Sequence, residues 1–453
     1  MISAPSHRQL LSGNKLFLII LLIIGISSCA SGKKVSSAAA VEVVSINQSK
    51  PKEDSVVKKP VTFDLETEES VTPSKNNTLP INTSAVVKVE NELKDRAYNI
   101  AVVLPFNLDQ VPLGQYADDT TKVLAVDSRN AVEFYLGCQM AKEKFSGKQL
   151  VANVYFLDDK NDSAALEHVF TQKPFPAIDY VVGPMSYDQM PVVAALAKKH
   201  QIPVISPLVS SVYLKQNPYF FNATPSFRAQ YVFLLKQIRK QYPQLPIEVV
   251  YDGTDSLAES VDLLKSAIQS EGFSGIGFKS VDATDDVVKL MATADTSSQR
   301  IVLLYSNKGA YIKTLVTKLK SIKNPLFVYT SSAAKSVKGL VDAKYPHDVF
   351  VAYPYSSGSL NYKIFATLFE EKYERRPTEI AHQAYDIMLH LFNLLDKKQA
   401  FPSVVRLQQV DFENTQSGFD FQPVYNKNGG VDYYDNSFMY LLKAENGVIV
   451  EVK

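Results

Sequence analysis

Residues Ser186 to Gln189 have the types and spacing of a helix start that could bind an anion. A serine followed three residues later by a glutamine forms a capping box, in which each side chain satisfies a backbone N–H of the first turn. The remaining N–H groups and the positive end of the helix dipole favour a carboxylate. We therefore expect Ser186 and Tyr187 to contact a ligand, although Ser186 would cap the helix without one.

Four further polar residues end, or come soon after, apolar runs of strand length. They are Asn107, Asp252, Tyr305 and Asn307. In open parallel sheets, ligands bind outside the carboxyl ends of the strands, so these residues are predicted to line a binding site. Tyr305 could equally be a core residue.

No arrangement of residues predicts catalysis, a cofactor or a metal site. The sequence lacks a Gly-rich phosphate loop with its lysine, a nucleophile elbow and a His-Glu metal helix. His382 and His390 are about two helical turns apart, too far to share a metal ion. We expect a protein that is not an enzyme.

The charge balance argues against a nucleic-acid-binding protein, and the composition predicts a globular protein with a buried cysteine. The chain has 48 basic and 47 acidic residues and a net charge of +1, which gives no electrostatic footprint for nucleic acid. Hydrophobic residues make up 46% of the chain, enough for large cores. Cys138 lies with Phe134, Ala141 and Phe145 in an apolar stripe at helical spacing, so we expect a buried, inert thiol.

The elements that position these residues alternate along the chain from Tyr98. Apolar runs of strand length occupy 100–106, 150–157, 180–183, 202–206, 247–251, 275–281, 301–305 and 326–329. Amphipathic helices are predicted over 128–145, 187–200, 229–241, 257–271 and 311–322. This alternation predicts an α/β fold with parallel sheets covered by helices on both faces. The length exceeds one comfortable domain, so we expect two lobes with a cleft between them.

The N-terminus has the layout of an export signal. Arg8 and Lys15 supply positive charge before the unbroken apolar run 16–26. Such a run spans about 16 Å as a helix, well short of a hydrocarbon core of ~30 Å, so it suits a signal peptide. The tetrapeptide 26–29 (ISSC) is similar to the bacterial lipobox, which implies cleavage before Cys29 and lipid on its thiol. A chance cysteine after an ordinary signal is the alternative.

Residues from Ala30 to about Arg96 are short of aromatic residues and rich in Ser, Thr, Lys, Glu and Pro, which predicts a flexible linker. The predicted divisions of the chain are a signal peptide 1–28, a flexible tether 29–96, lobe 1 97–222, lobe 2 223–331, a return to lobe 1 332–400, and C-terminal strands, mainly of lobe 2, 401–453.

A series of short stretches in chain order resembles the type I periplasmic solute-binding proteins, the leucine/isoleucine/valine-binding class. These stretches are 99–106 (NIAVVLPF), 134–140 (FYLGCQM), 180–186 (YVVGPMS), 202–207 (IPVISP), 219–226 (YFFNATPS), 349–355 with Tyr385-Asp386, and the tail 418–450. The similarity covers about Tyr98 to Leu395. It implies the two-lobed type I fold with a cleft between the lobes.

The resemblance also implies ligand contacts. Ser210 and Ser211 correspond to hydroxyl residues with which the family holds the polar head of its ligand, next to the helix start at Ser186. The second lobe departs from the amino-acid-binding pattern, because Lys308 follows Asn307 where the family tends to place an acidic residue. A lysine repels an ammonium group, which argues against a zwitterionic branched-chain amino acid.

Two functions remain open. The first is a lipid-anchored protein that binds a small molecule, such as an amino acid or peptide, in the cleft and works with an ABC permease or as a receptor. The second is an outer-membrane lipoprotein that regulates a peptidoglycan synthase and has a vestigial cleft. Residues 30–32 (ASG) lack the Asp that retains lipoproteins on the inner membrane, which implies a periplasm-facing place on the outer membrane.

Overall fold

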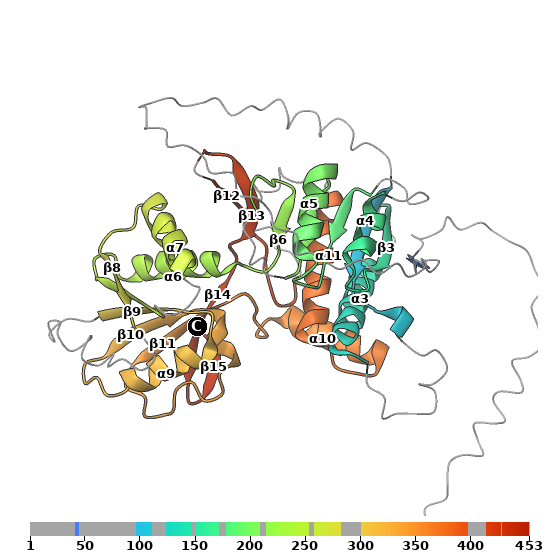
Figure 1. Cartoon of the computed structure of the whole chain (residues 1–453). Coiled ribbons are helices and arrows are strands. Elements are labelled where there is room, and N and C mark those ends of the chain that lie inside the picture. The colour runs from blue at the N-terminus through green and yellow to red at the C-terminus, as the bar shows by residue number, and fades with distance from the viewer. Residues whose placement is uncertain are drawn as a thin grey trace, which may run out of the picture. The chain divides into compact units, whose positions relative to one another are not determined.

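The computed structural model describes both predicted lobes and a short part of the predicted tether (Figure 1). The described ranges are 41–44, 97–110, 124–146, 150–171, 178–208, 214–252, 258–281, 300–396, 414–426 and 428–452. Cys29, the signal peptide and most of the tether lie outside these ranges, as do Ser210 and Ser211. Within the described ranges, no helix is long and apolar enough to cross a membrane.

The first sheet has the order β1-β3-β2-β4-β5-β6-β13-β12. Its strands are β1 Val41–Val44, β2 Tyr98–Leu104, β3 Ala152–Asp158, β4 Tyr180–Val182, β5 Val204–Ser206, β6 Phe220–Asn222, β12 Phe421–Tyr425 and β13 Val431–Asn436. Neighbouring strands are parallel except for the antiparallel pair β12 and β13. β1 lies within the predicted tether, whose composition predicts no strand.

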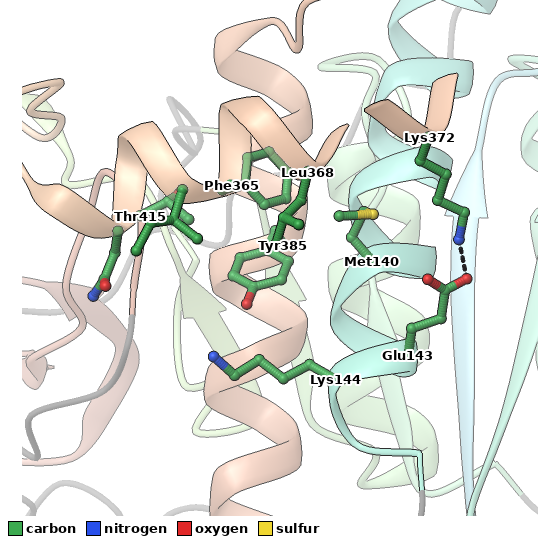
Figure 2. Close-up of a pocket in the computed structure, with 10 residues that line it drawn as sticks. Met140, Glu143, Lys144, Phe365, Leu368, Lys372, Tyr385 and Thr415 are labelled. Atoms are coloured by element: carbon green, nitrogen blue, oxygen red, sulfur yellow. Dashed lines mark hydrogen bonds and ion pairs between the residues drawn. The ribbon is translucent and has the colours of Figure 1, made fainter. Parts of the chain in front are cut away.

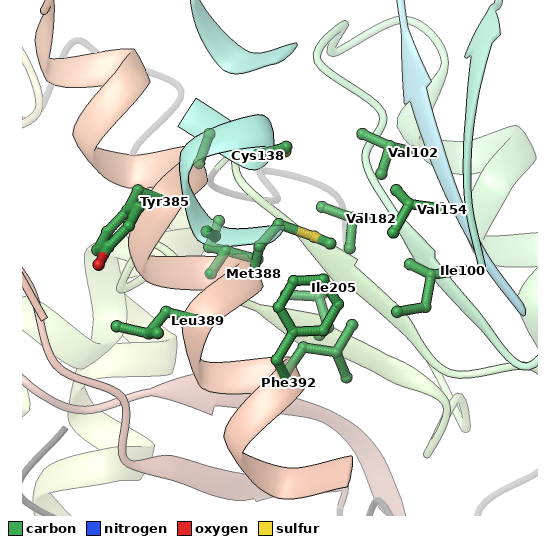
Figure 3. Close-up of a cluster of buried hydrophobic side chains, with 14 of the residues drawn as sticks. Ile100, Val102, Cys138, Val154, Val182, Ile205, Tyr385, Met388, Leu389 and Phe392 are labelled. Carbon is green, nitrogen blue, oxygen red and sulfur yellow. The ribbon is translucent and has the colours of Figure 1, made fainter. Parts of the chain in front are cut away.

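Helices cover both faces of the first sheet. They are α3 Val126–Lys144, α4 Ser163–Thr171, α5 Met190–His200, α10 Leu360–Tyr373 and α11 Glu379–Asp396. Successive residues of a strand point to opposite faces, so Ile100 and Val102 of β2 pack against α3 and α11, whereas Ala101 and Val103 pack against α4 and α5. Figure 3 shows the first of these cores, with Cys138 of α3 among its members.

The expectation of a buried Cys138 is confirmed. The residue is 1% exposed, and burial raises the pKa of its thiol well above the ordinary value. A thiol held in its neutral form is a poor nucleophile, so Cys138 acts as a packing residue.

The second sheet has the order β15-β14-β11-β10-β9-β7-β8. Its strands are β7 Ile247–Tyr251, β8 Ile276–Ser280, β9 Arg300–Tyr305, β10 Leu326–Thr330, β11 Asp348–Tyr353, β14 Tyr440–Glu445 and β15 Val448–Glu451. Helices α6 Phe227–Gln241 and α7 Ala258–Ser270 cover one face, and α9 Gly309–Leu319 covers the other. A short 3-10 helix, η2 Ser332–Ser336, follows β10, and another, η1 Leu108–Gln110, follows β2.

The predicted α/β fold with two lobes is confirmed, with two differences of detail. The sheets are mixed rather than wholly parallel, because β11, β14 and β15 pair antiparallel, as do β12 and β13. The return to lobe 1 starts after Tyr353 rather than at 332, because β11 still pairs with β10 in the second sheet. The C-terminal strands divide between the sheets, β12 and β13 joining the first and β14 and β15 the second.

Candidate functional site

Neighbouring parallel strands of the first sheet end at one edge, where most predicted ligand contacts of lobe 1 lie. β4 pairs with both β2 and β5, so the residues that follow these three strands come together there. Asn107 follows β2, Ser186 and Tyr187 follow β4, and the segment containing Ser210 and Ser211 follows β5. The topology therefore brings Asn107, Ser186 and Tyr187 to the same end of the sheet, whereas the contacts of Ser210 and Ser211 stay a prediction.

Asn107 is buried, and its side chain serves the turn after β2. Its Nδ2 donates to the Pro105 carbonyl at 3.1 Å and to Ser128 Oγ at 3.3 Å. Its backbone, at a φ of 52°, occupies the left-handed region that Asn tolerates better than most residues, and its N–H donates to Asp158 at 2.9 Å. The side chain of Asn107 is therefore occupied by the protein, and its ligand contact stays a prediction.

The helix predicted from Tyr187, with Ser186 as its N-cap, starts three residues later. α5 begins at Met190, and its N-cap, Gln189, makes no side-chain cap bond. The buried Gln189 amide instead donates to the Asn161 carbonyl at 2.8 Å and accepts from Ser163 Oγ at 3.0 Å. The predicted capping box is wrong, because tertiary contacts with the loop after β3 claim the Gln189 side chain.

Ser186 and Tyr187 consequently lie in the turn that leads into α5. Ser186 is partly buried, and Tyr187 is 55% exposed, although it is a large aromatic residue. An exposed tyrosine beside a strand end offers a flat apolar face and a hydroxyl to a bound molecule. Of the predicted lobe 1 contacts that the structure describes, Tyr187 is the most available to solvent.

A cluster of hydrogen bonds at this edge ties the first lobe to the two segments that cross between the sheets. Gln383 of α11 donates from Nε2 toward the Pro207 carbonyl at 2.7 Å and toward the hydroxyls of Thr224 and Tyr355, each at 2.9 Å. Thr224 Oγ1 also donates to Pro207 at 2.7 Å and lies 3.0 Å from the Tyr355 hydroxyl. Thr224 follows β6 and Tyr355 follows β11, so both crossings meet Gln383 here.

Sequence patterns do not single out Gln383, Thr224 or Tyr355 as functional residues. The stretches containing Thr224 and Tyr355 are recognisable in the sequence only as crossings between the lobes. The available signal is a glutamine on the buried side of an amphipathic helix. Gln383 is 9% exposed, and buried amides need hydrogen-bond partners.

In the second sheet, the predicted contacts divide between core and surface. Tyr305 is 1% exposed and packs against Tyr231 and Phe227, with ring centroids 4.5 and 4.7 Å away, so the core alternative holds. Asp252, after β7, is buried, whereas Asn307 and Lys308, after β9, are exposed. β7 and β9 are neighbours, which places Asp252 and Asn307 at one edge of this sheet.

A buried carboxyl group follows β3 at the edge of the first sheet and predicts a pH-dependent stability. Asp159 is fully buried, accepts a bond from the Asn161 N–H at 3.0 Å, and has no partner for Oδ2 among the described residues. Burial, with a smaller contribution from the charges of Asp158 and Asp127, raises its pKa from 3.8 to about 6. The folded protein therefore binds this proton more tightly than the unfolded chain does.

We expect Asp159→Asn to stabilise the protein at pH 8 but not at pH 4. A carboxyl pKa that is raised on folding contributes stability that is fully present below about pH 4 and is lost as the pH rises through about 6. Removing the charge should raise the free energy of unfolding at pH 8 by on the order of 1–2 kcal/mol relative to wild type. Urea unfolding of both proteins at the two pH values measures this difference. An equal effect of the substitution at both pH values would contradict the assignment.

Within the part of the chain that the structure describes, no group of three or more His, Cys, Asp or Glu residues could hold a metal ion. His382 and His390 are both buried in lobe 1, at 0% and 3% exposure, and burial lowers their pKa values to about 4 and about 3. Both rings are therefore neutral at physiological pH, and both lie on α11 among the buried residues of lobe 1.

A sequence model described as "Periplasmic binding protein" matches residues 111–409, well over half of the chain. The chain belongs to the periplasmic binding protein family. Two sheets of mostly parallel strands, each flanked by helices, give this periplasmic binding protein the type I fold, so the resemblance to the leucine/isoleucine/valine-binding class is confirmed.

Solved structures of this fold include proteins with two kinds of described role. A putative branched-chain amino acid ABC transporter from Rhodospirillum rubrum is 13% identical, with a TM-score of 0.57 over 79% of this chain and 100% of that one. An ABC transporter substrate-binding protein from Desulfitobacterium hafniense is 14% identical, with a TM-score of 0.51 and the same coverage. The C-domain of LpoA from Haemophilus influenzae, a regulator of PBP1A, is 13% identical, with a TM-score of 0.50 over 78% and 100%.

At these identities the similarity shows that the periplasmic binding protein shares a fold with these structures. It does not identify a ligand or a partner. No curated protein sequence matches the chain.

Proposed function

We propose that this periplasmic binding protein is a lipid-anchored envelope protein that binds a small molecule between its lobes, as the substrate-binding component of an ABC transporter or as a receptor. The observation that carries the proposal is that polar residues lie at the carboxyl ends of the strands in both sheets. Members of this family bind solutes. Tyr187 and Ser186 lie at the first edge, and Asn307 and Asp252 lie at the second. The predicted contacts at 210 and 211, which lie outside the described ranges, would complete the first edge.

The positive charge of Lys308, at the strand ends of the second sheet, favours some classes of ligand over others. Lys308 is exposed beside Asn307, after β9. A cation there favours a carboxylate or another negative group and disfavours an ammonium group at the same place. We therefore propose a ligand with an anionic or neutral polar group facing the second lobe, such as an acidic amino acid, a peptide or a related molecule, and not leucine or isoleucine.

A thermal-shift screen of the full chain in detergent tests this proposal. The panel comprises branched-chain and acidic amino acids, dipeptides and muropeptides. A ligand present at 100 times its dissociation constant should stabilise the folded protein by about 2.7 kcal/mol. The shift should disappear in Tyr187→Ala, because this exposed side chain contributes little to folding and lies at the predicted site. It should persist in Tyr425→Ala, since Tyr425 is a tyrosine of β12 with a comparable exposure of 63%. A shift that is unchanged in Tyr187→Ala would place the ligand elsewhere.

The lipid anchor has its own test. We expect Cys29→Ala to abolish incorporation of labelled palmitate in bacterial cells and to remove the mature protein from the membrane fraction, because no thiol would remain at the predicted cleavage point. Ser28→Ala keeps a small residue before the cysteine and should be labelled as wild type is. Label that persists in Cys29→Ala would contradict the anchor, since the other cysteine, Cys138, is buried.

A second function, the regulation of a peptidoglycan synthase, rests on a different observation. The LpoA C-domain has the same fold and is described as a regulator of PBP1A, and the predicted tether would hold this chain in the periplasm. In that case the screen should give no shift, and the full chain should retain a purified penicillin-binding synthase in a pulldown. A ligand shift without such retention favours the solute-binding function.

A further inference from the structure

Strand β1 adds to the first sheet from outside the predicted lobe 1. It pairs in parallel with β3, in a register that sets Val41 opposite Val154 and Val44 opposite Leu157. On its other side β3 pairs with β2, so β1 is the edge strand and β3 lies inside the sheet. The predicted tether therefore has a fixed point on lobe 1, well before the chain enters β2 at Tyr98.

Without β1, strand β3 would be the edge of the sheet, although it is buried as deeply as a central strand. Val154, Phe156 and Leu157 are each 1% exposed and pack into the cores on the two faces. The edge of such a strand presents unpaired N–H and C=O groups, which invite a further strand. β1 satisfies these groups through main-chain hydrogen bonds, as extended segments do when they bind a sheet edge.

The composition of β1 and the length of the chain behind it suit this pairing. Three of its four residues are valine, which favours extended backbone. Parallel strands need a connection of about a dozen residues or more, and residues 45–97 between β1 and β2 exceed that length several times. The connection is therefore long enough to reach β2, on the far side of β3, while β1 stays paired.

A groove on lobe 1 is another surface to which an extended segment could bind. It lies between α3, α10 and α11, with Phe365 and Tyr385 in its floor and the ion pair of Lys372 with Glu143 at one end (Figure 2). Its walls are helices, whose backbone groups are bonded within each helix. A short segment there would gain side-chain contacts but no main-chain ladder, so the β3 edge is the better site for a strand.

The fixed point at β1 changes how far the predicted anchor lets lobe 1 move from a membrane. Cys29, the predicted lipid site, is 12 residues before Val41, and a chain of that length spans at most about 40 Å. Cys29 is 69 residues before Tyr98, and that length could span about 230 Å. Residues 45–97 start and end on lobe 1 while β1 is paired, so they add nothing to the reach.

We propose that β1 is a clamp that docks on the β3 edge and holds lobe 1 within about 40 Å of the membrane that carries the anchor. This inference rests on the lipid anchor of the proposed function. A short reach fits a partner protein embedded in that same membrane, because lobe 1 stays near its surface. A partner beyond that distance would require the release of β1.

A disulfide test on the full chain measures docking without the anchor, so Cys29→Ala is present in every variant. Glu42 pairs with Tyr155, so Glu42→Cys with Tyr155→Cys should form an intrachain disulfide on mild oxidation. Glu42→Cys with Asn153→Cys is the matched control. Asn153 is partly buried, as Tyr155 is, but lies two residues out of register, so its disulfide should form about tenfold more slowly. The native Cys138 is buried and does not compete.

Equal rates for the two cysteine pairs would overturn the docking of β1 on β3. A disulfide that joins two chains would overturn it as well, because β1 would then bind a second copy.

A second test measures the reach in the lipidated protein. A Gly-Ser insert of about 20 residues is placed either before β1, after Ser36, or behind it, after Ser74. Lobe 1 carries a dye at Val151→Cys, a site that is 56% exposed, and energy transfer to a dye-labelled lipid is measured in phosphatidylglycerol vesicles. The insert after Ser36 should lower the transfer by more than half. The insert after Ser74 should leave it unchanged, because residues behind β1 do not contribute to the reach.

Equal effects of the two inserts would overturn the clamp. A full chain that does not associate with the vesicles would contradict the lipid anchor instead, and the disulfide test would still decide whether β1 docks.

Discussion

Asp386→Ala should lower the free energy of unfolding by about 4 kcal/mol, because the Asp386 carboxylate satisfies a set of buried backbone donors. It accepts the N–H groups of Thr415, Gln416 and Ser417 at 2.6, 3.0 and 3.0 Å, and the Thr415 hydroxyl at 3.0 Å. All of these residues are 6% exposed or less. A buried N–H that loses its acceptor costs about 1–3 kcal/mol, and several are lost together.

Burial raises the pKa of Asp386 to about 6, while the N–H groups act in the opposite direction, so the side chain is ionised at pH 8. Urea unfolding at pH 8 measures the loss, and hydrogen exchange should show that the Thr415–Ser417 amides open first. Asp342→Ala is the matched control. Asp342 also accepts a backbone N–H, from Lys344 at 2.9 Å, but it lies on the surface and should show no measurable change. Similar losses in the two variants would contradict the role of burial.

Gly137→Ala should destabilise the protein by about 3 kcal/mol, because α3 and α11 are in contact at this glycine. A Cβ on Gly137 would lie 2.1 Å from the Ala381 carbonyl oxygen and 2.9 Å from the Ala384 Cβ. The first of these atoms belongs to the α11 backbone, which cannot move aside as a flexible side chain can. Overpacking of a filled core costs about 1–3 kcal/mol, and contact with backbone puts this case at the upper end.

The control for this substitution is Gly277→Ala. Gly277 lies in β8, and a Cβ added there would meet no atom within 4 Å, so alanine should be neutral or slightly stabilising. Thermal unfolding of the two variants beside wild type measures the difference. If Gly137→Ala unfolds at the wild-type midpoint, the close approach of α3 and α11 is absent from the protein in solution.

The order of the elements was predictable because strands and helices of this fold carry strong local patterns. The apolar run at Ile100 and the helical stripe containing Cys138 specify a buried strand and the helix that covers it, and both are confirmed. Parallel strands buried on both faces are continuously apolar, which distinguishes them from surface strands. The assignment of the last strands to one lobe or the other was not predictable, because β13 and β14 pair with strands far away in sequence.

The candidate site was predictable as a location and less so in its residues. Strand ends identified the edges that carry Tyr187 and Asn307, since topology alone brings them to the carboxyl ends of their sheets. The capping box at Ser186 failed because Gln189 has better partners in the loop after β3. Tyr305 lies at a strand end, as the site prediction requires, but it packs against Tyr231 and Phe227 and is buried in the core.

The sequence by itself determined the α/β alternation, the two lobes, the burial of Cys138 and the family, because each depends on local periodicity or on short motifs in a fixed order. Only the tertiary structure decided which polar side chains form hydrogen bonds within the protein and which remain exposed to a ligand. Gln383, Thr224 and Tyr355 come from separate segments and meet at one point. Hydrogen bonds and close packing between residues distant in sequence leave no mark on local pattern, so the three-dimensional arrangement has to supply them.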